Sequence, residues 1–349
     1  MYKVEHIQSL SVVSAAALLV PGLALGLDFG GVDIGITPRV EVGGMYYKYL
    51  QGPVSKSVPP ATTQPGENYT QEQIEFTSTM PTLGGGLTFF WDRVFLDLSA
   101  QRAFNGSADD TSSYSQYLGT LQYPLDGVSR YSSANLNYNS DFDRDDYAIS
   151  LGYNFDQVGL YAGYKWAKTD FTTVASGPQS FFVADYIYGS YSPYNFVAEG
   201  IIRTTADYDF KYDGPFIGLV YGFGIDKGFF KGNLSFNAAV AFLNGEVNVN
   251  NRSDVTTINS INGLSIDPFQ VVPGSIPAAA GLGTNAINSK GDTTGFTFGI
   301  TWAGSTAVKG LGYSLNLGFY QYQFGADQSS NPDITESAIN FKAGISYEF

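Results

Sequence analysis

The sequence predicts an all-β protein: a transmembrane, antiparallel, up-and-down β-barrel of about ten strands. Segments of about ten residues alternate between apolar and polar side chains, which is typical of a tilted strand with lipid on one face and a polar lumen on the other. The connections between these segments are alternately short and long. The chain has 25 Tyr, 26 Phe and 41 Gly, yet its mean hydropathy is only -0.06, as expected when lipid-facing and lumen-facing residues cancel.

The first five strands are each predicted from a row of apolar side chains on one face. Asp92-Arg93 and Asp156-Gln157 supply tight turns after the second and fourth strands. The predicted strands and their outward residues are Arg39–Tyr49 with Val40, Val42 and Tyr46; Pro81–Trp91 with Leu83, Leu87 and Phe89; Val94–Ala100 with Leu96 and Leu98; Asp145–Phe155 with Tyr147, Ile149, Leu151 and Tyr153; and Val158–Lys168 with Leu160, Ala162, Tyr164 and Trp166.

The last five strands follow the same rule. Asp213-Gly214-Pro215 lies inside the sixth and predicts a bulge, because Pro cannot donate to a strand ladder. Asp226–Gly232 is a short turn. The predicted strands and their outward residues are Ala206–Ile225 with Ile217, Leu219 and Tyr221; Asn233–Val247 with Leu234, Phe236, Val240 and Phe242; Thr294–Trp302 with Phe296, Phe298 and Ile300; Leu311–Phe324 with Leu315, Leu317 and Phe319; and Ala338–Phe349 with Ile339, Phe341, Ile345 and Tyr347.

The long connections and the aromatic residues beside them orient the barrel. Bacterial barrels have short periplasmic turns and long extracellular loops, and an even strand number places both termini in the periplasm. Between eight and twelve strands are compatible with the sequence, and Phe181–Ser190 also fits a hairpin within a loop, which leaves room for twelve. A soluble β-sandwich or lipocalin-like barrel is the competing fold. The predicted long loops are Leu50–Gln73, Phe104–Arg144, Thr172–Thr205 and Asn248–Asp292, and the predicted lipid-facing girdle beside them contains Tyr46, Tyr47, Tyr49, Trp166, Tyr208, Phe210, Tyr320 and Tyr322.

The first 26 residues read as a secretory signal peptide. Leu10–Val20 is an apolar core, Pro21 interrupts it, and Ala24-Leu25-Gly26 supplies the small residues that cleavage requires. The apolar run is shorter than the roughly 20 residues that a membrane-spanning helix needs, so an uncleaved helix is the weaker alternative. We therefore expect a signal peptide over residues 1–26 and a single barrel domain over 27–349.

The C-terminal strand, Ala338–Phe349, ends the chain on an aromatic residue. It resembles the closing strand of Gram-negative outer-membrane β-barrel proteins, a porin-like class whose narrower family the residues do not specify. The resemblance implies a place in the cell outer membrane and contact with outer-membrane lipid and lipopolysaccharide. It also implies that Tyr347 and Phe349 belong to the signal read by the barrel-assembly machinery.

The predicted lumen-facing residues are small and polar, with charges of both signs. The charged ones are Arg39, Glu41, Asp97, Lys165, Lys342 and Glu348. They either pair with one another as a structural network, with Arg39, Lys165 and Lys342 opposite Glu41, Asp97 and Glu348, or line a narrow path for small solutes. About ten strands lie nearer the filled limit than the open one, because interior width grows with strand number.

Residue types exclude several chemistries. The only His is His6, inside the predicted signal peptide, and there is no Cys. The barrel enzymes that resemble this class, such as omptin-like proteases, depend on His, so we predict no catalytic residue, no enzyme activity and no cofactor. A formal net charge of -14 argues against a nucleic-acid partner.

The acidic run that contains Asp141, Asp143 and Asp145 is a weak candidate for a metal site. Alternating Asp supplies oxygen ligands of the kind that Ca²⁺ takes, but the Gly and Glu of the EF-hand pattern are absent, so a solvated acidic rim is the favoured interpretation. The leading functional prediction is a porin-like narrow or gated channel for small solutes. The alternative is a structural or surface-recognition barrel with a filled lumen that acts through its extracellular loops. The sequence specifies neither a solute nor an oligomeric state.

Overall fold

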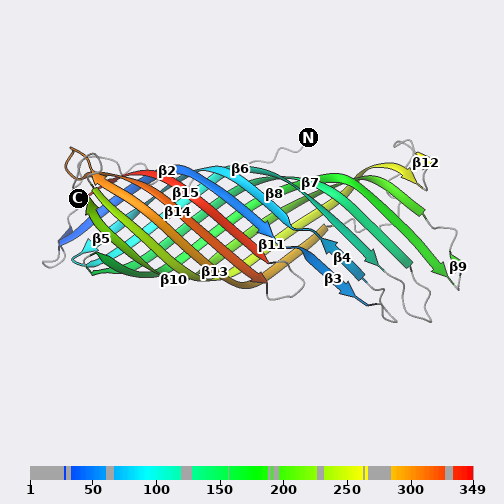
Figure 1. Cartoon of the computed structure of the whole chain (residues 1–349), viewed down its shortest axis with the longest axis horizontal. Coiled ribbons are helices and arrows are strands. Elements are labelled where there is room, and N and C mark those ends of the chain that lie inside the picture. Colours follow the sequence, from blue (N-terminus) through cyan, green and yellow to red (C-terminus); the bar gives the residue numbers. More distant parts are fainter. Residues whose placement is uncertain are drawn as a thin grey trace.

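The computed structural model describes residues 27–28, 33–59, 67–118, 128–155, 157–187, 190–191, 196–225, 232–261, 264–265, 284–326 and 333–348 (Figure 1). The predicted signal peptide and the predicted insertion-signal residue Phe349 lie outside these residues. No helix among the described residues is long and apolar enough to cross a membrane.

Ten antiparallel strands form a closed barrel, which confirms the predicted fold class. Each wall strand pairs with its neighbours along the chain, and pairing of the last with the first closes the barrel. The wall consists of β2 (Asp33–Gln51), β5 (Ile74–Trp91), β6 (Val94–Leu118), β7 (Val128–Phe155), β8 (Val158–Ile187), β10 (Phe196–Ile225), β11 (Gly232–Ile261), β13 (Thr284–Ser305), β14 (Leu311–Ala326) and β15 (Ile334–Tyr347). Short elements add to it: β1 (Leu27–Asp28), β3 (Val54–Val58), β4 (Glu67–Gln71), β9 (Ser190–Tyr191) and β12 (Leu264–Ser265).

The short-turn end of the barrel lies where the sequence predicts it. β5 ends at Trp91 and β6 begins at Val94, while β7 ends at Phe155 and β8 begins at Val158. Asp92 adopts a positive φ of 55°, which suits the tight turn that its side chain also favours.

The long-loop end differs from the prediction, because most of the predicted loops are strand. β8, β10 and β11 each contain 30 residues, and they continue far beyond the predicted strand ends (Figure 1). β4 and the upper part of β6 likewise occupy segments that the sequence assigns to loops. The barrel therefore has a tall extension of the wall on the side opposite the short turns.

An apolar band encircles the outer face near the short-turn end. On β7, Tyr147, Ile149, Leu151, Tyr153 and Phe155 are all outward and exposed. Nine residues span about 27 Å along a strand, or about 21 Å of height at a tilt of about 40°. This is close to the hydrocarbon thickness that membrane barrels match.

Above this band the hydrophobic pattern moves to the other face of the same strands. On β7 the inward residue Phe142 is 1% exposed, whereas its outward neighbours Asp141 and Asp143 are polar. The alternation therefore shifts by one residue without a break in the strand, because the wall now separates water outside from a packed core inside.

This shift corrects the predicted upper girdle. Only Tyr46 and Trp166 of that set are exposed outward. Tyr208 is half-buried against the inner core. The other members, Tyr47, Tyr49, Phe210, Tyr320 and Tyr322, are buried inside the barrel.

Two local irregularities also differ from the prediction. The β10–β11 register is continuous across Asp213 and Phe216, so the bulge predicted at Asp213-Gly214-Pro215 is absent. A bulge instead lies in β6, where the register with β7 shifts between Ala103 and Gly106. Asn105 has a positive φ of 56° there, which Asn tolerates better than most residues.

Candidate functional site

A layer of large side chains fills the barrel interior just above the apolar band. We call this layer the septum. Its members come from strands around the whole barrel, and among the described residues they include the largest side chains that solvent does not reach. The septum contains Met45, Tyr47, Tyr49, Phe76, Met80, Phe142, Arg144, Thr169, Phe171, Phe210, Tyr212, Tyr320, Tyr322, Phe324 and Glu336.

Aromatic rings connect opposite sides of the septum. Tyr49 on β2 lies 5.1 Å from Phe171 on β8 and 5.8 Å from Phe210 on β10, measured between ring centroids. Tyr212 on β10 stacks on Tyr322 on β14 at 5.7 Å. Such centroid distances are those of favourable aromatic pairs. The rings therefore meet across the lumen and leave it packed at this level.

Charged side chains cross the septum at its centre. Arg144 on β7 donates from Nη1 to Glu336 Oε2 on β15 at 2.7 Å, and neither side chain is exposed at all. Arg144 also donates to Thr169 Oγ1 at 2.7 Å and to Asp146 Oδ2 at 2.9 Å. Its guanidinium carbon lies 4.7 Å from the ring centroid of Tyr320, which is a cation–π contact.

The carboxylates of this network are shared. Glu336 Oε1 accepts a hydrogen bond from the Tyr47 hydroxyl at 2.9 Å. Asp146 Oδ1 lies 3.0 Å from Lys165 Nζ. Each of the four charged groups therefore has an opposite charge within ion-pair distance, as burial in a barrel interior requires.

A second charged network lies below the septum, and it contains four of the six predicted lumen-lining residues. Arg39 donates from Nη1 to Asp97 Oδ1 at 2.6 Å and lies 3.7 Å from Glu41. Lys342 Nζ lies 2.8 Å from Glu41 Oε2. These side chains are 17–24% exposed, so solvent reaches this part of the lumen.

The other two predicted lumen residues are elsewhere. Lys165 joins the septum through Asp146, a partner that the sequence did not indicate. Glu348 lies beyond the end of β15, where its backbone N–H donates to the Gly310 carbonyl and its side chain is exposed. Tyr347, the described residue of the predicted insertion signal, pairs with Leu311 at that same end of the barrel.

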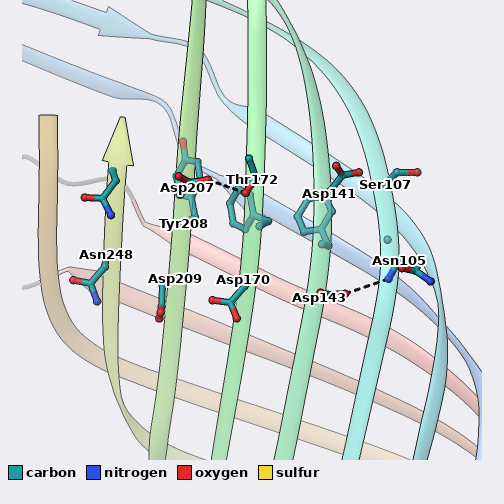
Figure 2. A pocket seen from close by; sticks show the side chains of 14 residues that line it. Asn105, Ser107, Asp141, Asp143, Asp170, Thr172, Asp207, Tyr208, Asp209 and Asn248 are labelled. Carbon is teal, nitrogen blue, oxygen red and sulfur yellow. Dashed lines mark hydrogen bonds between the residues drawn. The ribbon is translucent and has the colours of Figure 1, made fainter. Parts of the chain in front are cut away.

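The outer wall above the apolar band carries an open hollow of about 650 Å³. It crosses five strands, from β6 to β11, and its outward side chains form two rows in register (Figure 2). Asp141, Thr172 and Asp207 belong to one row, and Thr172 donates to Asp207 at 2.8 Å. The other row contains Asp143, Asp170, Asp209 and Asn248.

A row of mixed charge separates the hollow from the band. This row consists of successive register partners from β6 to β13: Arg102, Asp145, Lys168, Lys211, Glu246 and Lys290. Lys168 Nζ lies 2.7 Å from Asp170 and 3.5 Å from Asp209. Burial by itself would lower the pKa of Lys168, but the hydrogen bond and charge of Asp170 raise it overall. These cations relieve the repulsion between carboxylates that face one another across the strands.

The weak metal candidates Asp141, Asp143 and Asp145 project outward from alternate positions of β7. Alternate residues of a strand are about 7 Å apart, too far for one ion to bind all three. Arg102 lies 3.8 Å from both Asp143 and Asp145. Among the described residues, no group of three or more metal-ligating side chains is placed to hold an ion.

Sequence reasoning missed Arg144 and Glu336, the centre of the septum. Both fall in or beside segments that the sequence pattern assigns to a loop or a loop boundary. Continuing the alternation of Asp145–Phe155 back by a few residues would have placed Phe142, Arg144 and Asp146 on the inward face.

No family model and no curated protein matches this chain. Solved structures that resemble it are outer-membrane barrels. The outer membrane protease OmpT from Escherichia coli aligns with a TM-score of 0.49 at 9% identity and covers 90% of this chain and 97% of its own. The transport unit of the autotransporter AIDA-I from E. coli has a TM-score of 0.22 at 10% identity and covers 96% of each chain. A deletion mutant of the monoaromatic hydrocarbon channel TodX has a TM-score of 0.20 at 6% identity and covers 90% of each chain.

These resemblances concern the fold alone, and they correct one prediction. The sequence predicts that the protein is not an enzyme. This prediction was wrong, because the solved structures that resemble the chain include a protease. A fold does not specify an activity, so function must be argued from this chain's own interior and wall.

Proposed function

We propose that the protein is an outer-membrane barrel with a closed lumen that acts through the extracellular extension of its wall. The observation that carries this proposal is the septum. Arg144, Glu336 and Tyr47 meet at its centre with no more than traces of solvent contact. A side chain at the centre of an open pore would be hydrated, so this burial supports the filled-lumen alternative over a porin-like channel.

The geometry of the lower lumen fits the same proposal. Arg39, Asp97, Glu41 and Lys342 form a paired network with equal numbers of cations and carboxylates. A selective channel for ions of one sign would profit from an excess of one charge along its path. Paired and balanced charges instead fit a structural role in the barrel interior.

The extracellular wall is the part of the molecule that a partner would meet. Its two rows of outward Asp give this face a negative potential, and the whole chain carries a formal net charge of -14. Potentials of this kind attract cationic partners and raise their association rate. The surface therefore favours ligands rich in Lys or Arg.

Lipopolysaccharide stays a proposed partner. Exposed Tyr147 and Trp166 lie at the upper edge of the apolar band, and Arg102 and Lys168 are the next outward residues on β6 and β8. Aromatic rings at the lipid boundary with cations directly above them suit a leaflet whose headgroups carry phosphate. The localisation in the outer membrane is proposed on the same arrangement together with the closed apolar band.

Planar-bilayer recording tests the closed lumen. The purified, refolded barrel is expected to leave the bilayer insulating, with a known porin as positive control in the same lipid. Discrete openings of the wild-type barrel would contradict the proposal and restore the channel interpretation.

Binding of a polylysine peptide tests the wall. The barrel is inserted in nanodiscs of zwitterionic lipid, and binding is followed at low and high salt. The double variant Asp141→Asn/Asp207→Asn is expected to weaken binding several-fold at low salt. Asp92→Asn, which removes a carboxylate at the short-turn end, is the matched control and is expected to leave binding unchanged. If the double variant binds polylysine as strongly as the Asp92→Asn control does, this face is not the recognition surface.

A further inference from the structure

The ion pair of Arg144 and Glu336 joins opposite sides of the barrel. Going around the wall, β15 is followed by β2, β5, β6 and then β7, so these two strands face one another across the lumen. The 2.7 Å contact between Arg144 Nη1 and Glu336 Oε2 is therefore a transverse tie, and no ladder hydrogen bond connects the same two strands.

The tie belongs to a neutral group of four charges. Arg144 and Lys165 supply the cations, and Asp146 and Glu336 supply the carboxylates. The network below the septum is neutral as well, with Arg39 and Lys342 against Asp97 and Glu41. Removing one charge from the septum would thus leave these two networks together with a net charge of known sign.

Solvent already reaches the lower edge of this group. The side chains of Lys165 and Asp146 are 18% and 14% exposed, whereas those of Arg144 and Glu336 are not exposed. One layer of side chains therefore separates the hydrated lower lumen from the dry centre of the septum.

We propose that the Arg144–Glu336 tie is the lock that keeps the lumen closed, and that removing either charge opens the barrel to ions. The inference rests on the proposed closed lumen. A buried ion that loses its partner stays charged only where water reaches it, and the lower lumen is the nearest source of water. Replacing both partners by apolar side chains of similar volume removes the need for hydration, so the septum stays dry.

The sign of the remaining charge makes the inference specific. Arg144→Ala leaves an excess carboxylate in the septum, so its openings are expected to favour cations. Glu336→Gln leaves an excess guanidinium or ammonium, so its openings are expected to favour anions. A pore formed by general misfolding would not reverse its selectivity between these two variants.

Planar-bilayer recording under a KCl gradient tests the lock. Correct folding of each variant is first established by its heat-modifiable mobility on SDS gels. Wild type, the double variant Arg144→Met/Glu336→Leu and the outer-wall control Arg102→Ala are expected to be insulating. Arg144→Ala and Glu336→Gln are expected to raise the conductance at least tenfold over wild type, with reversal potentials of opposite sign.

The conductance of the single variants tests the lock, and the conductance of the wild type tests the closed lumen. Folded single variants that remain insulating would overturn the lock and leave the closed lumen intact. A conducting wild-type barrel would overturn the proposed function itself. If Arg144→Ala does not fold, the near-isosteric Glu336→Gln decides alone, and an insulating or cation-selective result for it refutes the lock.

Discussion

Truncating Phe171 would show whether the septum is a packed core or a loose lining. Phe171 is 3% exposed and lies near the centre of the aromatic layer. Its ring centroid lies 4.2 Å from that of Tyr208, 5.0 Å from Phe142 and 5.4 Å from Phe210. The first and last of these rings are nearly parallel to it, with interplanar angles of 10° and 7°. Phe171→Ala would therefore remove several ring contacts at once and leave a cavity.

The expected cost follows from these contacts. A buried Phe→Ala change costs about 3–5 kcal/mol, since it combines lost transfer free energy with an unfilled cavity. Phe242 is the matched control, because it is 61% exposed on the apolar band, where it would meet lipid rather than protein in the proposed membrane. Phe242→Ala loses mainly the transfer of one ring from water to lipid, about 2 kcal/mol. The Phe171 variant should thus be less stable than the Phe242 variant by about 2 kcal/mol, the difference between these two costs.

Reversible urea unfolding in lipid vesicles, followed by tryptophan fluorescence, provides the measurement. Both variants should retain the m-value of the wild type, so that the difference lies in the midpoint. Equal destabilisation by the two substitutions would refute the packed septum, because it would mean that Phe171 loses no protein contacts beyond those that lipid also supplies.

Three further predictions concern other parts of the wall. A Cβ on Gly43 would lie 2.0 Å from the Phe341 carbonyl oxygen, whereas the atom nearest to a Cβ on Gly44 would be 3.8 Å away. Gly43→Ala should therefore weaken the pairing of β2 with β15 that closes the barrel, and Gly44→Ala should not; heat-modifiability assays measure the difference. Burial raises the pKa of Tyr208 to about 12. The neutral phenol is favoured in the folded state, so this stability is fully present below the unfolded pKa of about 10 and is lost as the pH rises toward 12. Wild type should therefore lose about 2 kcal/mol more than Tyr208→Phe over this range in urea titrations. Asp92 has a φ of 55°, so Asp92→Val should cost about 1–2 kcal/mol in unfolding experiments while Asp92→Gly stays near neutral.

The sequence determined the parts of the barrel whose outer face is apolar and whose inner face is polar. Alternation over Asp145–Phe155 and Val158–Lys168 placed β7 and β8, because an apolar outer face and a polar inner face repeat every two residues there. The same alternation places four charged residues on the inner face of their strands, and in the structure they form one network in the lumen: Arg39, Glu41, Asp97 and Lys342.

Only the tertiary structure decided the extension and the septum. Above the band the apolar residues lie on the inner face of the strands. A prediction that assumes an apolar outer face therefore ends the strands before it reaches Phe142 and Phe171. Arg144 and Glu336 are 192 positions apart in the chain, and their contact exists only because the barrel closes and brings β7 opposite β15. Local periodicity records which face of a strand is apolar, whereas the medium that this face meets is set by the curvature and closure of the whole sheet.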